Sequence, residues 1–172
     1  MPLGNVVISQ EEIRRRTAAL AREIETAIPD GDLHVIITLK GGLFFGADLI
    51  RALRREVTLG FITASSYGGG TESTGKVLLK ASDVGKITGR HVLIVEDIID
   101  TGRTLEAVVG AIREQAPASV HTAALIDKPS RRKAPIDADF IGFPVEDVFL
   151  VGYGLDYAEK FRDLPDIRAF EL

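Results

Sequence analysis

The amino-acid sequence predicts an α/β protein with a mostly parallel, twisted sheet flanked by helices. Short, almost wholly apolar runs rich in Val and Ile, at residues 34–39 (HVIITL) and 91–95 (HVLIV), are typical of strands buried on both faces. Segments with a helical spacing of apolar residues alternate with such runs, which favours right-handed crossovers between parallel strands. In a fold of this kind, ligands bind where strands end and helices begin.

The first half of the chain is expected to form two helices and three strands. Ser9 and Glu12 have the spacing of a capping box, which predicts that a helix begins here and continues to about Ala27. In chain order, the next elements expected are a strand at residues 34–39, a helix at 44–55, and strands at 57–64 and 77–80. Residues 65–75 (SSYGGGTESTG) have too few apolar side chains to pack, so we expect a mobile loop there.

The second half of the chain continues the same alternation. After the strand at residues 91–95, a helix is expected at 105–114, and it should stop before Pro117. Three further strands are expected at residues 119–126, 140–143 and 149–153. Because the sequence has neither an internal repeat nor a low-complexity linker, we expect residues 1–172 to form a single domain.

The composition excludes several classes of protein. A net charge of −4 argues against non-specific nucleic-acid binding, which needs a broad basic surface. No apolar run approaches the roughly 20 residues that span a bilayer, and the N-terminus, MPLGNVV, lacks a signal-type segment, so we expect a cytoplasmic protein without membrane contact. The chain has no cysteine and three widely spaced histidines, which excludes disulfides and the usual zinc sites. A metal ion would therefore need oxygen ligands.

Short basic runs occur at residues 14–16, 54–55 and 131–133. Each has the charge to contact a phosphate, but runs of this length are mostly solvated faces of a protein. We therefore assign them no function from charge alone.

The segment at residues 92–105, VLIVEDIIDTGRTL, carries the most chemical information. Glu96 and Asp97 lie at the carboxyl end of a buried strand, where paired carboxylates can accept hydrogen bonds from the two hydroxyls of a ribose or reach a divalent cation. The loop at residues 100–104 places hydroxyls and a glycine before a helix, whose amides and dipole favour phosphate. A sugar diol beside a phosphate indicates a ribose 5-phosphate. The alternative is a strand end with solvated acids and a Thr-capped helix.

This segment resembles the phosphoribosyl-pyrophosphate motif of the type I phosphoribosyltransferases. In that family the acidic pair holds the ribose diol and the loop binds the 5-phosphate. The resemblance implies the type I phosphoribosyltransferase fold, with a small hood formed by terminal segments. The residues that it assigns to ribose and 5-phosphate binding are Glu96, Asp97, Asp100, Thr101, Gly102, Arg103 and Thr104. Of these, Arg103 is expected to act through its backbone only.

Other segments, in the order expected, narrow the resemblance to the hypoxanthine-guanine phosphoribosyltransferases. Residues 39–42 (LKGG) look like the family's pyrophosphate loop, in which a non-proline cis peptide precedes the lysine and backbone amides face the leaving group. Ser66 and Tyr67 are similar to the start of the family's mobile loop, which closes over the reacting groups. Without the family, these segments are a commonplace turn and a plain surface loop. The pyrophosphate-binding residues that the resemblance implies are Lys40, Gly41 and Arg162.

Base recognition is expected from the C-terminal third of the chain. In the family, the lysine matched by Lys128 contacts the 6-oxo group of the purine, and the aromatic matched by Phe149 stacks on the base. The backbone at Leu150 would meet the opposite edge, and Asp156 resembles the carboxylate that helps to place magnesium on pyrophosphate. Without the family, Phe149 is a core residue, and Lys128 and Arg162 are surface residues.

The resemblance implies an enzyme of purine salvage. In the reaction, N9 of hypoxanthine or guanine attacks C1 of phosphoribosyl pyrophosphate, which gives IMP or GMP and releases pyrophosphate. Asp100 lies where the family's general base meets N7 of the purine. The cofactor implied is Mg²⁺, with Glu96, Asp97 and Asp156 as its ligands. Relatives are usually dimers or tetramers, so we expect a homodimer or a homotetramer.

Two alternative functions share the same ribose-phosphate motif. A regulator that senses phosphoribosyl pyrophosphate would need a DNA-binding segment or a basic face, and the sequence has neither. A pyrimidine or adenine phosphoribosyltransferase is the other, and Lys128 and Phe149 argue against it. The sequence does not rank hypoxanthine, guanine and xanthine, so a xanthine-preferring enzyme is a further alternative. That choice rests on the C2 edge of the purine and on the backbone near Leu150 and Asp156.

Overall fold

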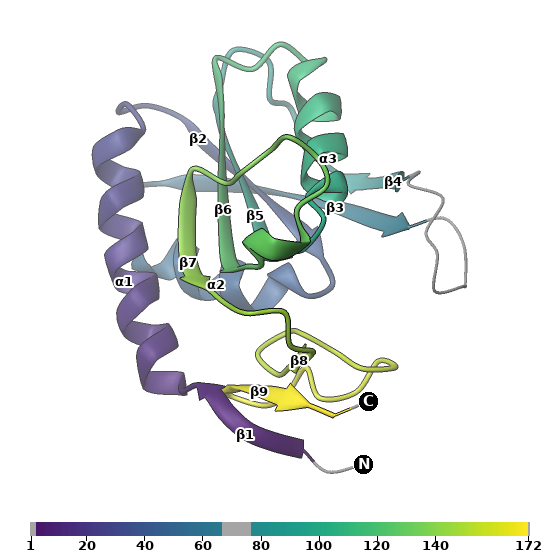
Figure 1. Cartoon of the computed structure of the whole chain (residues 1–172). Helices are drawn as coiled ribbons and strands as arrows, with labels where there is room; N and C mark the ends of the chain where they lie inside the picture. The colour runs from purple at the N-terminus through teal and green to yellow at the C-terminus, as the bar shows by residue number, and fades with distance from the viewer. Residues whose placement is uncertain (1–2, 67–76, 172) are drawn as a thin grey trace.

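The computed structural model describes residues 3–171 except for residues 67–76, and it contains a large sheet and a small one (Figure 1). The elements in chain order are β1 (Leu3–Ile8), α1 (Gln10–Ala27), β2 (Leu33–Leu39), α2 (Gly42–Ala52), β3 (Val57–Ser66), β4 (Val77–Asp83), β5 (His91–Ile99), α3 (Arg103–Arg113), β6 (Ser119–Asp127), η1 (Pro129–Arg131), β7 (Phe140–Pro144), β8 (Leu150–Val151) and β9 (Ile167–Phe170). No helix in this part of the chain is long and apolar enough to cross a bilayer.

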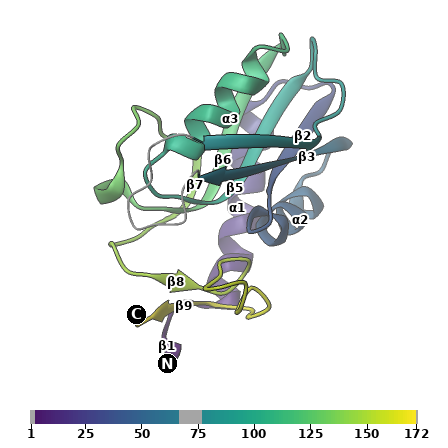
Figure 2. The same cartoon turned by 90° about the vertical axis from the view of Figure 1, so that its right-hand side faces the viewer.

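The large sheet has the strand order β4-β3-β2-β5-β6-β7, and all neighbouring strands are parallel except β3 and β4. Its apolar strands are buried on both faces, as the sequence predicts. Ile37 and Val95 pack in one core cluster with residues of α1 and α2, whereas Ile36 and Ile94 pack in another with residues of α3. The helices accordingly lie on opposite faces of the sheet (Figure 2). This arrangement confirms the predicted mostly parallel α/β fold.

The small sheet is formed by β1, β9 and β8, paired antiparallel, and lies beyond the C-terminal ends of β5 and β6. Both ends of the described chain are in this sheet (Figure 1). It is the hood that the family resemblance implied. Strands β1 and β9 were not predicted from their residues. Each is short, and the two pair with each other although they lie near opposite ends of the sequence.

Most predicted elements are confirmed, with changes at their ends. The second helix ends at Ala52 rather than residue 55, and Arg55 instead donates hydrogen bonds to carbonyl groups that follow α1, including that of Pro29 at 2.8 Å. The strand expected at residues 149–153 is only Leu150–Val151, because Gly152 has φ +101° and cannot continue an extended strand. Of the predicted mobile loop, the first two residues belong to β3 and the rest lies outside the described residues.

His34 forms a buried junction between β2, β3 and the segment that follows β4. Its Nε2 lies 2.6 Å from the carbonyl oxygen of Val84, so this nitrogen carries the proton and Nδ1, 2.7 Å from the Thr58 hydroxyl, accepts. Gly60 permits this packing, because a Cβ there would lie 2.7 Å from Nε2. Burial lowers the pKa of His34, since an imidazolium would lose its hydration.

Candidate active site

A cavity of about 420 Å³ opens at the carboxyl ends of β2, β3 and β5. The connections after β2 and β5 leave toward opposite faces of the sheet, since α2 covers one face and α3 the other. Such a switch point leaves a crevice between the two connections, where α/β proteins bind ligands. The cavity is lined by strand ends, by the loop at residues 100–104 and by Glu159 and Arg162 from the C-terminal region.

Two acidic side chains at the end of β5 occupy the centre of this site. Glu96 is 4% exposed, and its Oε1 has no hydrogen-bond partner within the described chain. Burial, followed by the charge of Asp97, raises the pKa of Glu96 to about 8. Burial also raises the pKa of Asp97 to about 6, against the stabilising hydrogen bond from the Ile98 amide and the charge of Arg162. A buried oxygen without a partner is a place for a ligand donor or cation.

Asp97 packs directly on the turn that follows β2. A Cβ on Gly41 would lie 1.7 Å from Asp97 Oδ2, so only glycine leaves room for this carboxylate. The Leu39–Lys40 peptide bond in the same turn is cis, which confirms the expectation from the family. On the other side, Gly154, with φ +97°, lies so close that a Cβ there would be 2.3 Å from the Gly41 carbonyl oxygen. The turn is therefore fixed between β5 and the C-terminal region.

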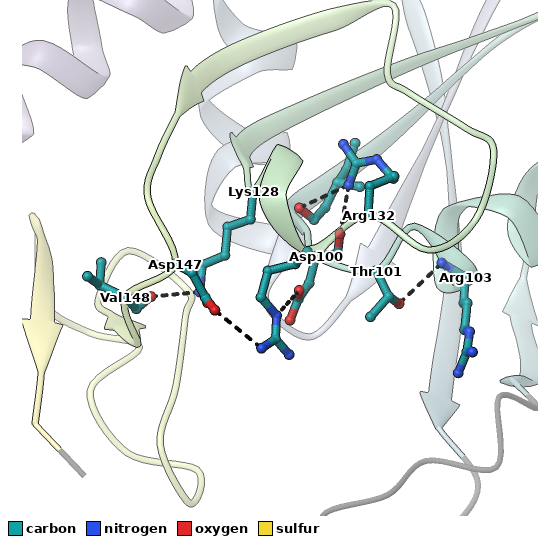
Figure 3. A network of polar contacts seen from close by, with 9 residues as sticks. Asp100, Thr101, Arg103, Lys128, Arg132, Asp147 and Val148 are labelled. Carbon is teal, nitrogen blue, oxygen red and sulfur yellow. Dashed lines mark hydrogen bonds and ion pairs between the residues drawn. The ribbon is translucent and has the colours of Figure 1, made fainter.

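The loop at residues 100–104 leads into α3. Gly102 is the N-cap residue, and its φ of +82° suits glycine. The Thr101 hydroxyl accepts a hydrogen bond from the Arg103 amide at 3.4 Å (Figure 3). Gly102 and Thr104 line the cavity, so the N-terminus of α3 opens on it, as anion binding at a helix N-terminus requires. The backbone amides of Lys133 and Ala134 both donate to the Thr101 carbonyl oxygen at 2.9 Å, which fixes the loop from the β6–β7 connection.

In the basic run at residues 131–133, Arg131 and Lys133 are exposed as expected, but Arg132 is largely covered and both arginines contact Asp100. The side chain of Arg132 is 14% exposed, pairs with Asp127 and donates to the Asp100 carbonyl oxygen at 2.7 Å (Figure 3). Arg131 Nε lies 2.7 Å from Asp100 Oδ1, and its NH1 lies 3.4 Å from Asp147 Oδ2. The run thus holds both the backbone and the side chain of Asp100.

A second cavity, of about 580 Å³, adjoins the first and shares Asp97 and Asp100 with it. Lys128 is one of the residues that line this second cavity. The Lys128 side chain is 8% exposed, donates to the Val148 carbonyl oxygen at 2.6 Å and lies 3.8 Å from Asp147 Oδ1 (Figure 3). Phe149 also lines the cavity and is 38% exposed, which makes it neither a core residue nor a covered one. Leu150 and Asp156 complete the set of predicted base-pocket residues in this cavity.

Two cationic side chains that are far apart in the sequence, Lys40 and Arg162, line the first cavity. Lys40 Nζ lies 2.7 Å from Glu159 Oε2, and Arg162 NH2 lies 2.9 Å from Asp156 Oδ1 and 3.4 Å from Glu159 Oε1. Arg162 also donates to the Gly154 carbonyl oxygen at 2.7 Å. The predicted pyrophosphate residues are therefore gathered, together with a carboxylate that the sequence analysis did not select.

The structure thus brings the predicted site residues into two adjoining cavities, except for Ser66, Tyr67 and Arg103. Arg103 is the first residue of α3 and lines neither cavity. Ser66 is the last residue of β3, and Tyr67 lies outside the described residues. Glu96, Asp97 and Asp156 line these cavities, and their role as metal ligands stays a prediction. Residues 3–66 and 77–171 contain no group of three or more acidic or histidine side chains that could hold a metal ion by itself.

Three charged residues in or beside these cavities were not predicted from the sequence. Arg131 and Asp147 face Asp100 and Lys128, and Glu159 faces Lys40. The only sequence signal was position, since Arg131 follows Lys128 closely and Glu159 lies between Asp156 and Arg162. Position alone does not distinguish such residues from solvated charges.

Three features meet at this switch point: an acidic pair, a helix N-terminus suited to bind phosphate, and a glycine turn. Together they are typical of the phosphoribosyltransferase class. The chain belongs to the phosphoribosyl transferase domain family, whose model matches residues 6–158. The hypoxanthine-guanine phosphoribosyltransferase of Bacillus subtilis (strain 168) is 46% identical over 96% of this chain and 92% of its own length. The hypoxanthine phosphoribosyltransferase of Haemophilus influenzae is 40% identical over 93% of this chain and 91% of its own.

Solved structures agree with these sequence relatives. The crystal structure of a hypoxanthine-guanine phosphoribosyltransferase from Bacillus anthracis superposes with a TM-score of 0.93 at 42% identity, and the match covers 99% of this chain and 100% of that one. The fold is therefore the type I phosphoribosyltransferase fold, and the predicted enzyme class is confirmed.

Proposed function

We propose that this protein transfers the 5-phosphoribosyl group from phosphoribosyl pyrophosphate to N9 of hypoxanthine or guanine, giving IMP or GMP and pyrophosphate. The main support is the pair of adjoining cavities that share Asp97 and Asp100. The first cavity has a loop suited to bind phosphate, and the second has the buried amine of Lys128 and the exposed ring of Phe149. A sugar phosphate in the first cavity and a planar base in the second would meet at their boundary. The names of the relatives point to the same reaction and to purine salvage.

In this proposal Asp100 accepts or shares the proton of the purine imidazole while N9 attacks C1 of the ribose. Arg131 holds the Asp100 carboxylate at the boundary of the cavities, so a base there needs little reorganisation. The loop amides of residues 101–104 bind the 5-phosphate, and Glu96 and Asp97 receive the ribose hydroxyls. Lys40 and Arg162 stabilise the negative charge that develops on pyrophosphate as the C1–O bond breaks.

The described residues fit a magnesium ion that is bound mainly through substrate and water. Asp97 and Asp156 lie close enough for the Asp156 charge to raise the pKa of Asp97, and carboxylates are hard oxygen ligands. Mg²⁺ usually takes one or two protein carboxylates together with phosphate oxygens and keeps several waters. When bound, it would neutralise charge on the diphosphate and so make pyrophosphate a better leaving group.

Selection of 6-oxopurines would come from Lys128. Its ammonium group has three donors, and the Val148 carbonyl oxygen takes one, so donors are left for an oxygen acceptor at C6 of the base. Adenine presents an amino group there. The exposed ring of Phe149 offers a stacking surface for either base, so the ring supplies affinity and the lysine supplies selectivity.

An activity screen with phosphoribosyl pyrophosphate and MgCl₂ tests the proposal. Hypoxanthine, guanine, xanthine and adenine are supplied separately, and nucleotide and pyrophosphate formation are measured. We expect IMP or GMP formation, with adenine used poorly. Preferred use of xanthine would support the xanthine-specific alternative. Binding of phosphoribosyl pyrophosphate with no turnover of any base would refute the proposal and support the sensing function.

Three further properties stay predictions: a single domain over residues 1–172, a homodimer or homotetramer, and a cytoplasmic location. The oligomeric state follows only from resemblance. Sedimentation equilibrium of the purified protein would test it, because a monomer at micromolar concentration would contradict the expectation.

A further inference from the structure

A carboxylate of the protein occupies the position between the two cations that are proposed to bind pyrophosphate. Glu159 Oε2 lies 2.7 Å from Lys40 Nζ, and Glu159 Oε1 lies 3.4 Å from Arg162 NH2, so its two oxygens face different cations. All three residues line the first cavity. An anion that bridges a lysine and an arginine with separate oxygens reproduces, on a small scale, what a diphosphate would do there.

The backbone holds Glu159 in this place. Ala158 and Glu159 have φ values of +50° and +64°, and the Glu159 amide donates to Asp156 Oδ2 at 2.8 Å. A tight turn that brings Tyr157 and Lys160 together thereby presents the Glu159 side chain to the cavity. The hydrogen bond and charge of Lys40 lower the pKa of Glu159, so the carboxylate is ionised at neutral pH.

The contact is suited to be displaced. The side chains of Lys40 and Glu159 are 67% and 64% exposed, so water competes for both charges and the pair is weak. A diphosphate with its magnesium carries more charge and more acceptor oxygens than one carboxylate. Because it is not part of the chain, it can contact both cations without requiring a particular backbone conformation.

We propose that Glu159 is an internal anion that competes with pyrophosphate, and with the diphosphate of the substrate, for Lys40 and Arg162. This inference rests on the proposed function of the site. Its consequence is that Glu159 weakens diphosphate binding and so favours release of the pyrophosphate product. Glu159 also keeps Lys40 and Arg162 oriented toward the cavity while no ligand is bound.

The test is calorimetric binding of pyrophosphate, in the presence of MgCl₂ and the absence of any base, to wild type, Glu159→Gln and Glu114→Gln. Glu114 is exposed at the far end of α3, so its variant loses the same charge away from the site. We expect Glu159→Gln to lower the Kd for pyrophosphate by about two- to five-fold, because an exposed ion pair competes only weakly with the ligand. Glu114→Gln should bind like wild type.

Glu159→Asn repeats the test with a residue that tolerates positive φ, so that a backbone effect of glutamine does not decide the result. An unchanged or raised Kd in both Glu159 variants overturns the inference, because a residue that only supports the cations would weaken binding when removed. An equal gain in Glu114→Gln also overturns it, since overall charge would then be the cause. If wild type binds no pyrophosphate, the proposed function itself fails, and the inference fails with it.

Discussion

Replacement of Gly41 by alanine should disable the site through Asp97. The backbone of Gly41 has φ −58° and ψ −41°, which alanine adopts readily, so the substitution causes no backbone strain. The added methyl group is the problem, because it would lie 1.7 Å from Asp97 Oδ2 and 2.6 Å from Asp97 Cγ. Real Cβ contacts of this length do not occur, so the carboxylate must move away.

The size of the effect follows from what Asp97 loses. Its Oδ1 accepts a hydrogen bond from the Ile98 amide at 2.9 Å, and a bond to a charged group contributes about 1.5 to 3 kcal/mol. A displaced rotamer adds about 0.5 to 1.5 kcal/mol, while the stiffer unfolded chain offsets about 0.4 to 1 kcal/mol. The net loss in free energy of unfolding is therefore about 1 to 4 kcal/mol. If Asp97 receives a ribose hydroxyl, losing that bond weakens phosphoribosyl-pyrophosphate binding by roughly 10- to 100-fold.

Urea unfolding measures the first quantity, and calorimetry with phosphoribosyl pyrophosphate and MgCl₂ measures the second. Gly110→Ala is the matched control, because Gly110 lies within α3 with nothing within 4 Å of an added Cβ. That variant should gain about 0.5 to 1 kcal/mol from helix propensity and bind the ligand normally. Wild-type affinity in Gly41→Ala would refute the assigned role of Asp97, even if the protein were destabilised.

Further predictions concern the base, the proton and pH. Asp100→Asn should lower kcat by about 10²-fold with little change in affinity for phosphoribosyl pyrophosphate, because it removes a general base and keeps its shape; a kcat near that of wild type would exclude Asp100 from proton transfer. Wild type should favour hypoxanthine over adenine by about 10³-fold in kcat/KM, and Lys128→Ala should lose much of this preference because the buried amine selects the 6-oxo group; equal use of both bases by wild type would contradict it. His34 has a lowered pKa in the folded protein, so its contribution to stability is present above the unfolded value of about 6.5 and is lost as pH falls toward the folded value. The free energy of unfolding should therefore fall as pH drops from about 6.5 toward the folded pKa, by up to about 1.4 kcal/mol per pH unit. His34→Gln should flatten this part of the curve in urea titrations, and an unchanged slope would show that other groups cause it. Turnover should stop in excess chelator and return with MgCl₂, and full activity in chelator would show that no cation is needed.

The sequence by itself determined the local parts of the fold. The capping box of Ser9 and Glu12 forms as predicted, with both of its hydrogen bonds present, because its partners are neighbours in the chain. The buried strands could be predicted because a run such as residues 91–95 is apolar on both faces. The motif at residues 92–105 could be recognised because its acidic residues, its loop and its helix follow one another in the sequence.

Only the tertiary structure decided which distant charges meet. Arg131 reaches Asp100 across 31 residues of sequence, and Glu159 reaches Lys40 across 119. Neither pair has a local pattern, because the switch-point topology and the return of the chain through the hood set both distances. Burial is likewise a property of the folded chain, and it turns Glu96 from an ordinary acid into one with a pKa of about 8. Hydrophobic periodicity thus specifies the elements, whereas charge pairing and desolvation depend on how those elements are packed.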